Sequence, residues 1–136
     1  MNKQQVIDIV NNYCELVFSD FETASAMMTD DFVWENLLPD HIPFGRRYEG
    51  IDGMKTYVEE LAETWGLGKI IFHDYIYDPE TRIMVTSGVE KNGKALATGR
   101  TCDMDFMWEF RLTEDGKISY VREYNDTNTI ADTFDR

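Results

Sequence analysis

Residues 31–57 read DFVWENLLPDHIPFGRRYEGIDGMKTY, and this stretch decides the fold. It runs from a strand-like apolar segment through a long loop with prolines and a glycine into the start of an amphipathic helix. This order predicts one wall and the mouth of a ligand cavity. With the closing stretch 115–130, DGKISYVREYNDTNTI, it predicts a cone-shaped α+β fold, in which N-terminal helices pack on a curved, mainly antiparallel sheet that encloses a cavity.

Helical periodicity is present on both sides of the first stretch. Apolar residues recur at three- and four-residue steps within residues 6–17 and within residues 54–65, which predicts two amphipathic helices. Ser19 and Glu22 fit a capping box, so we expect a short helix there as well. A strand is then expected at residues 32–37.

The second half of the chain is typical of an antiparallel meander. Turn dipeptides separate its β-rich runs, which predicts strands at 70–77, 83–90, 95–112 and 117–125 with turns at Asp78-Pro79, Asn92-Gly93 and Asp115-Gly116. Residues 101–112 alternate between apolar and mostly acidic side chains, so one face of this strand should line the core or the cavity. A last short helix is expected at residues 128–134, over the sheet edge or against a partner subunit.

Length and charge limit the classes of protein to consider. The 136 residues are 43% hydrophobic, which suits one domain with one core over residues 1–136. A net charge of −13 repels nucleic acid and anionic membranes, so neither is expected as a partner. No apolar run is long enough to span a bilayer, and we expect a cytoplasmic protein. Cys14 and Cys102 have no metal-binding spacing and are expected to be free thiols.

The segments TDDFVWEN, PFGRRYEGIDGMKTY and FRLTEDGKISYVREYND, in this order after two helices, resemble the NTF2-like superfamily. The resemblance covers essentially the whole chain and is to the SnoaL-like and ketosteroid-isomerase-like branches. It implies a cavity for a small hydrophobic molecule, no cofactor, and a homodimer formed through the outer face of the sheet.

The resemblance also tests two known mechanisms. The resemblance to the steroid isomerases implies that Tyr13 stands at the position of their oxyanion tyrosine. It also implies that Asn36 stands at the position of their proton-shuttling aspartate and Trp108 at that of their protonated aspartate. An amide is no base at neutral pH and an indole has a single donor, so steroid isomerisation by that mechanism is not expected. Limonene-epoxide hydrolases use an Asp-Arg-Asp set that activates water, and the nearest candidates here are Arg100 and Asp103. Strand spacing sends these two side chains to opposite faces, so this mechanism is not expected either.

Glu123 is the preferred catalytic residue. SnoaL-like cyclases carry a proton-shuttling acid near the end of this strand, a position for which Glu123 and Asp126 compete. Either residue set alternates equally well, so the register with Tyr124 and Asp126 inward stays open. An inward Glu123 would have a pKa raised towards neutrality by desolvation. The structural alternative is an acid paired with an arginine such as Arg122 or Arg111.

Two further groups are candidates for a role in catalysis or ligand binding, and each also has a purely structural interpretation. His73 lies on a predicted strand and would donate to a carbonyl or enolate, or else is a polar residue on the sheet surface. Arg46 and Arg47 lie in the predicted mouth loop and would attract an anionic ligand, or else are solvated loop charges.

Aromatic residues are the expected ligand walls. Trp34 and Trp108 are preferred, and further ligand-binding candidates are Tyr57, Trp65 and Phe106. The acidic residues Asp103, Asp105 and Glu109 lie on the opposite face from the apolar residues, which indicates a solvated face or an oligomer contact. No metal site is predicted, because no loop has metal-ligand spacing.

The preferred hypothesis is a cofactor-free isomerase, cyclase or lyase-type enzyme that transfers protons on a small hydrophobic carbonyl compound. Glu123 would be the acid or base, with Tyr13, His73 and Asn36 as hydrogen-bond partners of the oxyanion. The first alternative is a module that binds a hydrophobic metabolite without transforming it, since both aspartates of the steroid isomerases are missing. The second is an NTF2-like protein-interaction domain.

Overall fold

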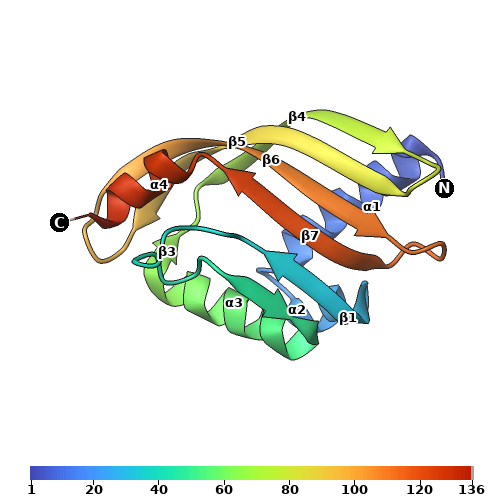
Figure 1. Cartoon of the computed structure of the whole chain (residues 1–136), viewed down its shortest axis with the longest axis horizontal. Coiled ribbons are helices and arrows are strands. Elements are labelled where there is room, and N and C mark those ends of the chain that lie inside the picture. Colours follow the sequence, from blue (N-terminus) through green and yellow to red (C-terminus); the bar gives the residue numbers. More distant parts are fainter. Residues whose placement is uncertain (136) are drawn as a thin grey trace.

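The computed structural model describes residues 1–135 of the chain (Figure 1). Within these residues the helices and strands are α1 (Lys3–Leu16), α2 (Phe21–Ser25), β1 (Met28–Glu35), β2 (Arg47–Glu49), α3 (Gly50–Thr64), β3 (Trp65–Gly66), β4 (Lys69–Asp78), β5 (Ile83–Ala95), β6 (Thr101–Leu112), β7 (Ile118–Asn125) and α4 (Thr127–Phe134). None of these helices is both long and apolar enough to cross a membrane.

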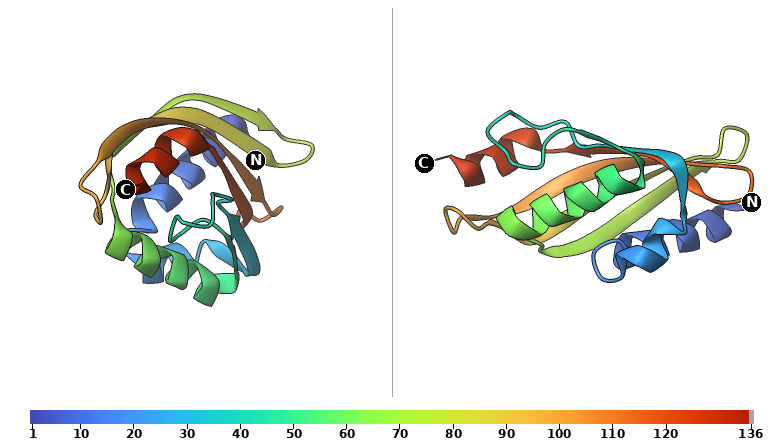
Figure 2. Two further views of the ribbon diagram at one scale, coloured as in Figure 1. Left: turned by 60° about the vertical axis from the view of Figure 1, so that its left-hand side comes forward. Right: turned by 90° about the horizontal axis from the view of Figure 1, so that it is seen from below.

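One curled, mixed sheet organises the molecule. Its strand order is β2-β1-β7-β6-β5-β3, and β4 also pairs with β5. Every pairing is antiparallel except that of β1 with β7, which is parallel. The sheet curves around the helices, with α1 and α3 across its open side (Figure 2). The predicted α+β fold with a curved, mainly antiparallel sheet is therefore confirmed.

The core lies between the helices and the inner face of this sheet. The predicted stripe of α1 buries Val6, Val10 and Tyr13, and its N-terminus carries a capping box between Asn2 and Gln5. Along β6 the alternation holds as well, because residues 104, 106, 108, 110 and 112 are buried while most of their neighbours are exposed. Period-2 burial of this kind gives β6 one face towards the core and one towards solvent.

The N-cap of α2 differs from the prediction by one residue. Asp20, not Ser19, is the N-cap, and its carboxylate accepts hydrogen bonds from the backbone N–H and the hydroxyl of Thr23. Ser19 instead donates its hydroxyl hydrogen to the Glu15 carbonyl at 2.8 Å. The Ser19 capping box was therefore wrong, since a carboxylate one residue later satisfies the helix N-terminus.

The hairpin predicted at Asn92-Gly93 was also wrong. β5 continues through both residues to Ala95, and the register with β6 shifts between Glu90 and Gly93, which marks a bulge. Asn92 has a φ of 59°, and its backbone N–H donates to Asp103 at 2.9 Å. A residue pair that favours turns thus also suits this bulge, because Asn92 tolerates the positive φ that the backbone adopts there.

We expect Gly88→Ala to destabilise the protein by about 2 kcal/mol or more, because overpacking a core forces backbone and side chains apart. A Cβ at residue 88 would overlap the Ile71 carbonyl and the Phe106 ring. Gly66→Ala is the matched control, since the nearest atom to its added Cβ lies at 3.5 Å. Urea denaturation of both variants checks this, and equal losses of stability would contradict it.

Candidate active site

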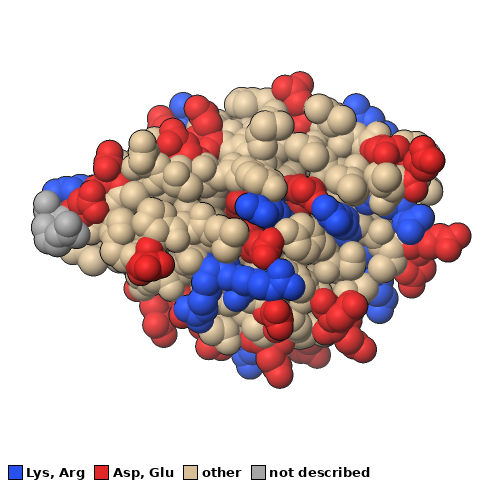
Figure 3. Space-filling model, viewed as in Figure 1, with Lys and Arg blue, Asp and Glu red and all other residues tan. Residues whose placement is uncertain are grey.

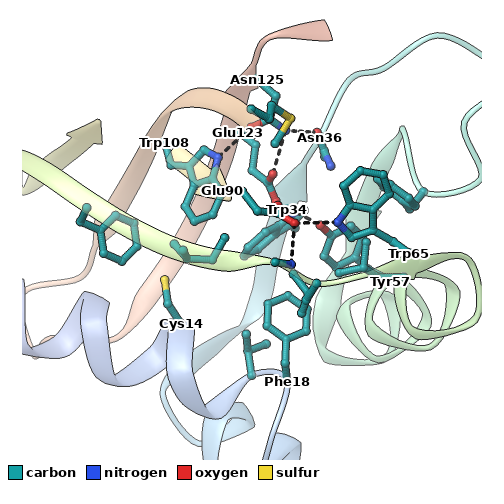
Figure 4. Close-up of a pocket in the computed structure, with 18 of the residues that line it drawn as sticks. Cys14, Phe18, Trp34, Asn36, Tyr57, Trp65, Glu90, Trp108, Glu123 and Asn125 are labelled. Carbon is teal, nitrogen blue, oxygen red and sulfur yellow. Dashed lines mark hydrogen bonds between the residues drawn. The ribbon is translucent and has the colours of Figure 1, made fainter. Parts of the chain in front are cut away.

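A cavity of about 480 Å³ lies between the helices and the inner face of the sheet (Figure 4). Elements from along the whole chain supply its walls, among them α1 with Cys14, β1 with Trp34, α3 with Tyr57, β6 with Trp108 and β7 with Glu123. Most other lining residues are apolar or aromatic. A concave apolar space with a few convergent polar groups is the usual form of a small-molecule site.

The structure decides between the two registers of β7. Val121 and Glu123 are buried, whereas Tyr124 on the alternate face is 50% exposed. Asp126 lies outside the cavity and caps α4, where its carboxylate accepts from the backbone N–H of Thr129. Glu123 is thus the inward acid, and the parallel pairing with β1 on one side and the antiparallel pairing with β6 on the other fix that choice.

Glu123 is held by neutral donors. Tyr57 donates its hydroxyl hydrogen to Oε1 at 3.1 Å, and Asn125 donates from Nδ2 to Oε2 at 2.9 Å. The arginines named as structural partners bind elsewhere: Arg122 faces Glu35 at 3.8 Å, and Arg111 binds Glu109 at 2.5 Å. The expectation of an arginine-paired acid is therefore not met, and hydrogen bonds alone stabilise the carboxylate.

A chain of amides orients this carboxylate. The Trp108 indole Nε1, which can only donate, binds Asn125 Oδ1 at 3.0 Å and so fixes which end of that amide is oxygen. Asn125 Nδ2 then faces Glu123 and also donates to Asn36 Oδ1 at 3.0 Å. Because its oxygen is occupied, Asn36 turns its own Nδ2 away from Asn125. Asn36, expected as a hydrogen-bond partner of the oxyanion, and Trp108, expected as a ligand wall, thus also position the acid.

Burial sets the proton affinities in the cavity. It raises the pKa of Glu123 to about 7, an effect that hydrogen bonds from Asn125 and Tyr57 oppose and the like charge of Glu90 adds to. Burial also raises the pKa of Tyr57 well above its usual value, and that of the Cys14 thiol to about 12. Of these three groups only Glu123 exchanges its proton near neutral pH, which is the condition for general acid–base catalysis.

A second buried carboxylate was missed from the sequence. Glu90 on β5 is 4% exposed and lines the same cavity, and its Oε2 accepts hydrogen bonds from Trp65 Nε1 at 2.8 Å and from the Gly68 N–H at 3.0 Å. The signal was present, because Glu90 follows the buried residues Met84 and Thr86 at even spacing along the strand. It was overlooked because a charged residue at the end of a predicted strand is usually exposed.

Most of the aromatic residues expected as ligand walls border the cavity. Trp34, Tyr57, Trp65 and Trp108 all line the cavity. Phe106 lies behind that wall, where it stacks on Trp108 with ring centroids 3.9 Å apart. The buried Trp34 Nε1 makes no hydrogen bond, although its N–H is close enough to Glu123 to lower the pKa of that carboxyl slightly.

Two candidate oxyanion donors lie outside the cavity. The Tyr13 hydroxyl donates to Met28 Sδ at 3.1 Å within the core. His73 is exposed on β4, because a register shift between Phe72 and Asp74 turns it away while Phe72 lines the cavity. The structure therefore brings neither side chain to Glu123.

The cavity does not open at the loop where the sequence predicted its mouth. The loop between β1 and β2 buries Leu38, Ile42 and Phe44 and closes that end. Arg46 points away from the cavity, pairs with Glu60 at 2.8 Å and lies over the Tyr48 ring. The exposed lining residues instead gather at the end of α1 and after β3, where they are Asn11, Glu15, Phe18 and Leu67. Apolar loop residues that appeared to border an opening fill it instead.

We expect Tyr57→Phe to raise the pKa of Glu123 further, since it removes a hydrogen bond that stabilises the charged form. Tyr48→Phe is the matched control, because the Tyr48 hydroxyl donates to Glu60 at 2.8 Å and not to Glu123. Carbon-13 NMR of the labelled glutamate carboxyls would follow the titration. A pKa of Glu123 that moves in both variants or in neither would contradict the assignment.

Comparison with known proteins agrees with this architecture. The family model described as SnoaL-like domain matches residues 10–121. No curated protein matches the sequence. Among residues 1–135, no group of three or more His, Cys, Asp or Glu side chains is arranged to hold a metal ion.

Similar solved structures extend over nearly the whole chain. An NTF2-like protein from Burkholderia xenovorans is 18% identical with a TM-score of 0.80, and the match covers 99% of each chain. A putative isomerase from Bacillus subtilis is 16% identical with a TM-score of 0.80, over 98% of this chain and 96% of that one. The epoxide hydrolase/cyclase-like enzyme SalBIII, described in pyran ring formation in the polyether salinomycin, is 15% identical with a TM-score of 0.73, over 94% and 95%. At this level of identity the likeness shows the fold alone.

Proposed function

Because this chain belongs to the SnoaL-like domain family, we propose that it is a cofactor-free enzyme that isomerises, cyclises or cleaves a small hydrophobic carbonyl compound by proton transfer. One observation carries the proposal: Glu123 is a buried carboxylate in an aromatic cavity, its pKa is raised to about 7, and only neutral donors hold it. Structural neighbours described as a putative isomerase and an epoxide hydrolase/cyclase-like enzyme support the reaction class.

The proposed step begins with ionised Glu123. Its carboxylate takes a proton from the carbon next to the substrate carbonyl, and the electron pair of that C–H bond forms an enolate. The protonated Glu123 then returns the proton to a second atom of the same molecule, so an isomerisation consumes nothing. Tyr57 follows the proton, since its hydroxyl donates to Glu123 as a carboxylate and accepts from it as an acid.

The oxyanion needs a donor that the structure does bring to the cavity. Tyr13 and His73 are excluded by position, which leaves Asn36 from the set expected from the sequence. Its Oδ1 is engaged by Asn125, so Nδ2, which also lies near the Tyr57 hydroxyl, is the end that would donate to an enolate oxygen. In a site sheltered from water such a donor stabilises developing charge more strongly than it does in solution.

Deuterium exchange of 2-tetralone in D₂O is the experiment that tests this function. This ketone is small, apolar and aromatic, and loss of its α-proton signals in NMR reports the first step without knowledge of the natural substrate. We expect exchange above the buffer rate, and the rate should rise with pH through about 7 as Glu123 ionises. Binding of 2-tetralone without accelerated exchange would favour the alternative of a pocket that holds a metabolite without transforming it.

We also propose homodimerisation, which rests on the family resemblance, and a cytoplasmic location, which rests on the sequence pattern. The outer face of β6 and β7 agrees with the first, because Met107 is 48% and Tyr124 50% exposed there.

A further inference from the structure

We infer that the molecule bound in the cavity carries a hydroxyl or ammonium head group, which binds Glu90, and that the cavity rejects carboxylates of the same shape. The inference deepens the proposed function, since it adds a second anchor to a substrate whose carbonyl faces Glu123. Figure 4 shows both carboxylates directed into the same space from different strands.

Glu90 has an oxygen left for a ligand. Its Oε2 accepts from Trp65 and from the backbone of Gly68, while its Oε1 accepts no hydrogen bond from residues 1–135. The side chain is 4% exposed and borders the cavity. This oxygen has no donor among the described residues and borders the cavity, so it is available to accept a hydrogen bond from a donor group on a ligand.

The surroundings hold Glu90 in one position. Trp65 stacks on Phe134 with ring centroids 5.8 Å apart and meets the edge of Phe44 at 5.9 Å. A Cβ at Gly93 would overlap the Trp65 ring and lie 2.6 Å from Glu90 Oε2, so the bulge of β5 lets the backbone approach this pair. The acceptor is therefore fixed before a ligand arrives, which reduces the entropic cost of binding.

The charge of the cavity excludes anions. Glu90 and Glu123 lie inside it and Glu15 at its opening, whereas none of the described lining residues is Lys, Arg or His. Basic side chains lie on the outer surface among acids, as Figure 3 shows for one face, and Arg47 for example binds Glu35 and Glu49. A carboxylate entering this low-dielectric space would meet only like charges. An ammonium group would meet carboxylates and aromatic faces, both of which attract cations.

The two anchors come from different positions along the sheet. In the sheet register Glu90 pairs with Met104 on β6, whereas Glu123 pairs with Trp108. Both side chains reach into one cavity, so a ligand that contacts both must carry two polar groups.

Three naphthalene probes test the inference. They are 2-naphthylmethylamine, 2-naphthylmethanol and 2-naphthoate, which share one ring system and differ in the head group. We expect calorimetry at pH 7 to show the amine and the alcohol binding at least tenfold more tightly than the carboxylate. Equal or tighter binding of 2-naphthoate, or no binding of the amine and the alcohol, would overturn the inference.

A pair of variants assigns the effect to Glu90. Glu90→Gln should weaken binding of the amine about tenfold, whereas Glu60→Gln removes the same charge outside the cavity and should not. Equal losses in both would mean that general charge, not Glu90, attracts the amine. The selectivity of the unmodified protein keeps the inference testable if Glu90→Gln does not fold. Since 2-tetralone has no donor group, binding of 2-tetralone without exchange would overturn the proposed function and leave this result standing.

Discussion

Glu123→Gln is expected to lower the rate of 2-tetralone exchange by about 100-fold or more, the usual contribution of a general base. Glutamine has the same shape and can still accept from Asn125 through its oxygen while donating to Tyr57, so the cavity should keep its form. What the variant loses is the group whose pKa of about 7 lets it take up and release a proton near neutral pH. The measurement is the initial exchange rate by NMR at pH 8.

Asp126→Asn is the matched control for this result. Asp126 was the competing candidate from the sequence, and the structure places it outside the cavity at the N-terminus of α4. Asparagine caps helices as well as aspartate does, so the variant should fold and keep its exchange rate within about twofold. An unchanged rate in Glu123→Gln, or a large loss in Asp126→Asn, would show that the acid has been assigned to the wrong residue.

The same Glu123→Gln substitution is expected to stabilise the protein at pH 8. Desolvation raises the pKa of Glu123 from an ordinary 4.5 to about 7 in the folded state. Between these values the folded protein keeps a proton that the unfolded chain releases, so stability falls as pH rises through this window. A shift of this size lowers the stability of the wild type by about 3 kcal/mol at high pH, at about 1.4 kcal/mol per pKa unit. Glutamine does not ionise, so the variant does not lose this stability.

Urea denaturation of both proteins between pH 4.5 and 8.5 measures this difference, where the lower limit is the ordinary pKa of the group. The free energy of unfolding of the variant should increase relative to that of the wild type as pH rises to about 7, and this difference should change little above pH 7. The variant minus wild-type difference removes the contributions of other carboxylates, such as Glu35, whose pKa is lowered mainly by its hydrogen bond from Tyr120. A difference that does not vary with pH would mean that Glu123 titrates normally. Increased stability with lost activity is the expected trade-off at an active site.

The charge pattern of the cavity connects these predictions to substrate choice. The like charge of Glu90 contributes to the raised pKa of Glu123 after the larger effect of burial. An ammonium group bound at Glu90 would offset that repulsion. Glu90, the proposed anchor, and Glu123, the proposed base, are thus coupled through the electrostatic field of one cavity.

The sequence by itself determined most of the secondary structure and most of the buried faces. Helical spacing placed α1 and α3, and alternation in β6 identified its buried face, because these periods follow from backbone geometry within a single element. Aromatic wall residues such as Trp34 and Trp108 could be chosen for the same reason. Such patterns need no knowledge of which other element lies opposite.

Only the tertiary structure decided which side chains meet. The alternation of β7 allowed either Glu123 or Asp126 to face inward, and pairing with β1 and β6 made the choice. A bulge in β4 turned His73 outward, and the β1–β2 loop filled its own end of the fold, which moved the opening to α1. Glu90 became a cavity residue because Trp65 and Gly68 come to it from beyond the end of α3. Register and burial depend on contacts between distant segments, and a local pattern in the sequence does not contain them.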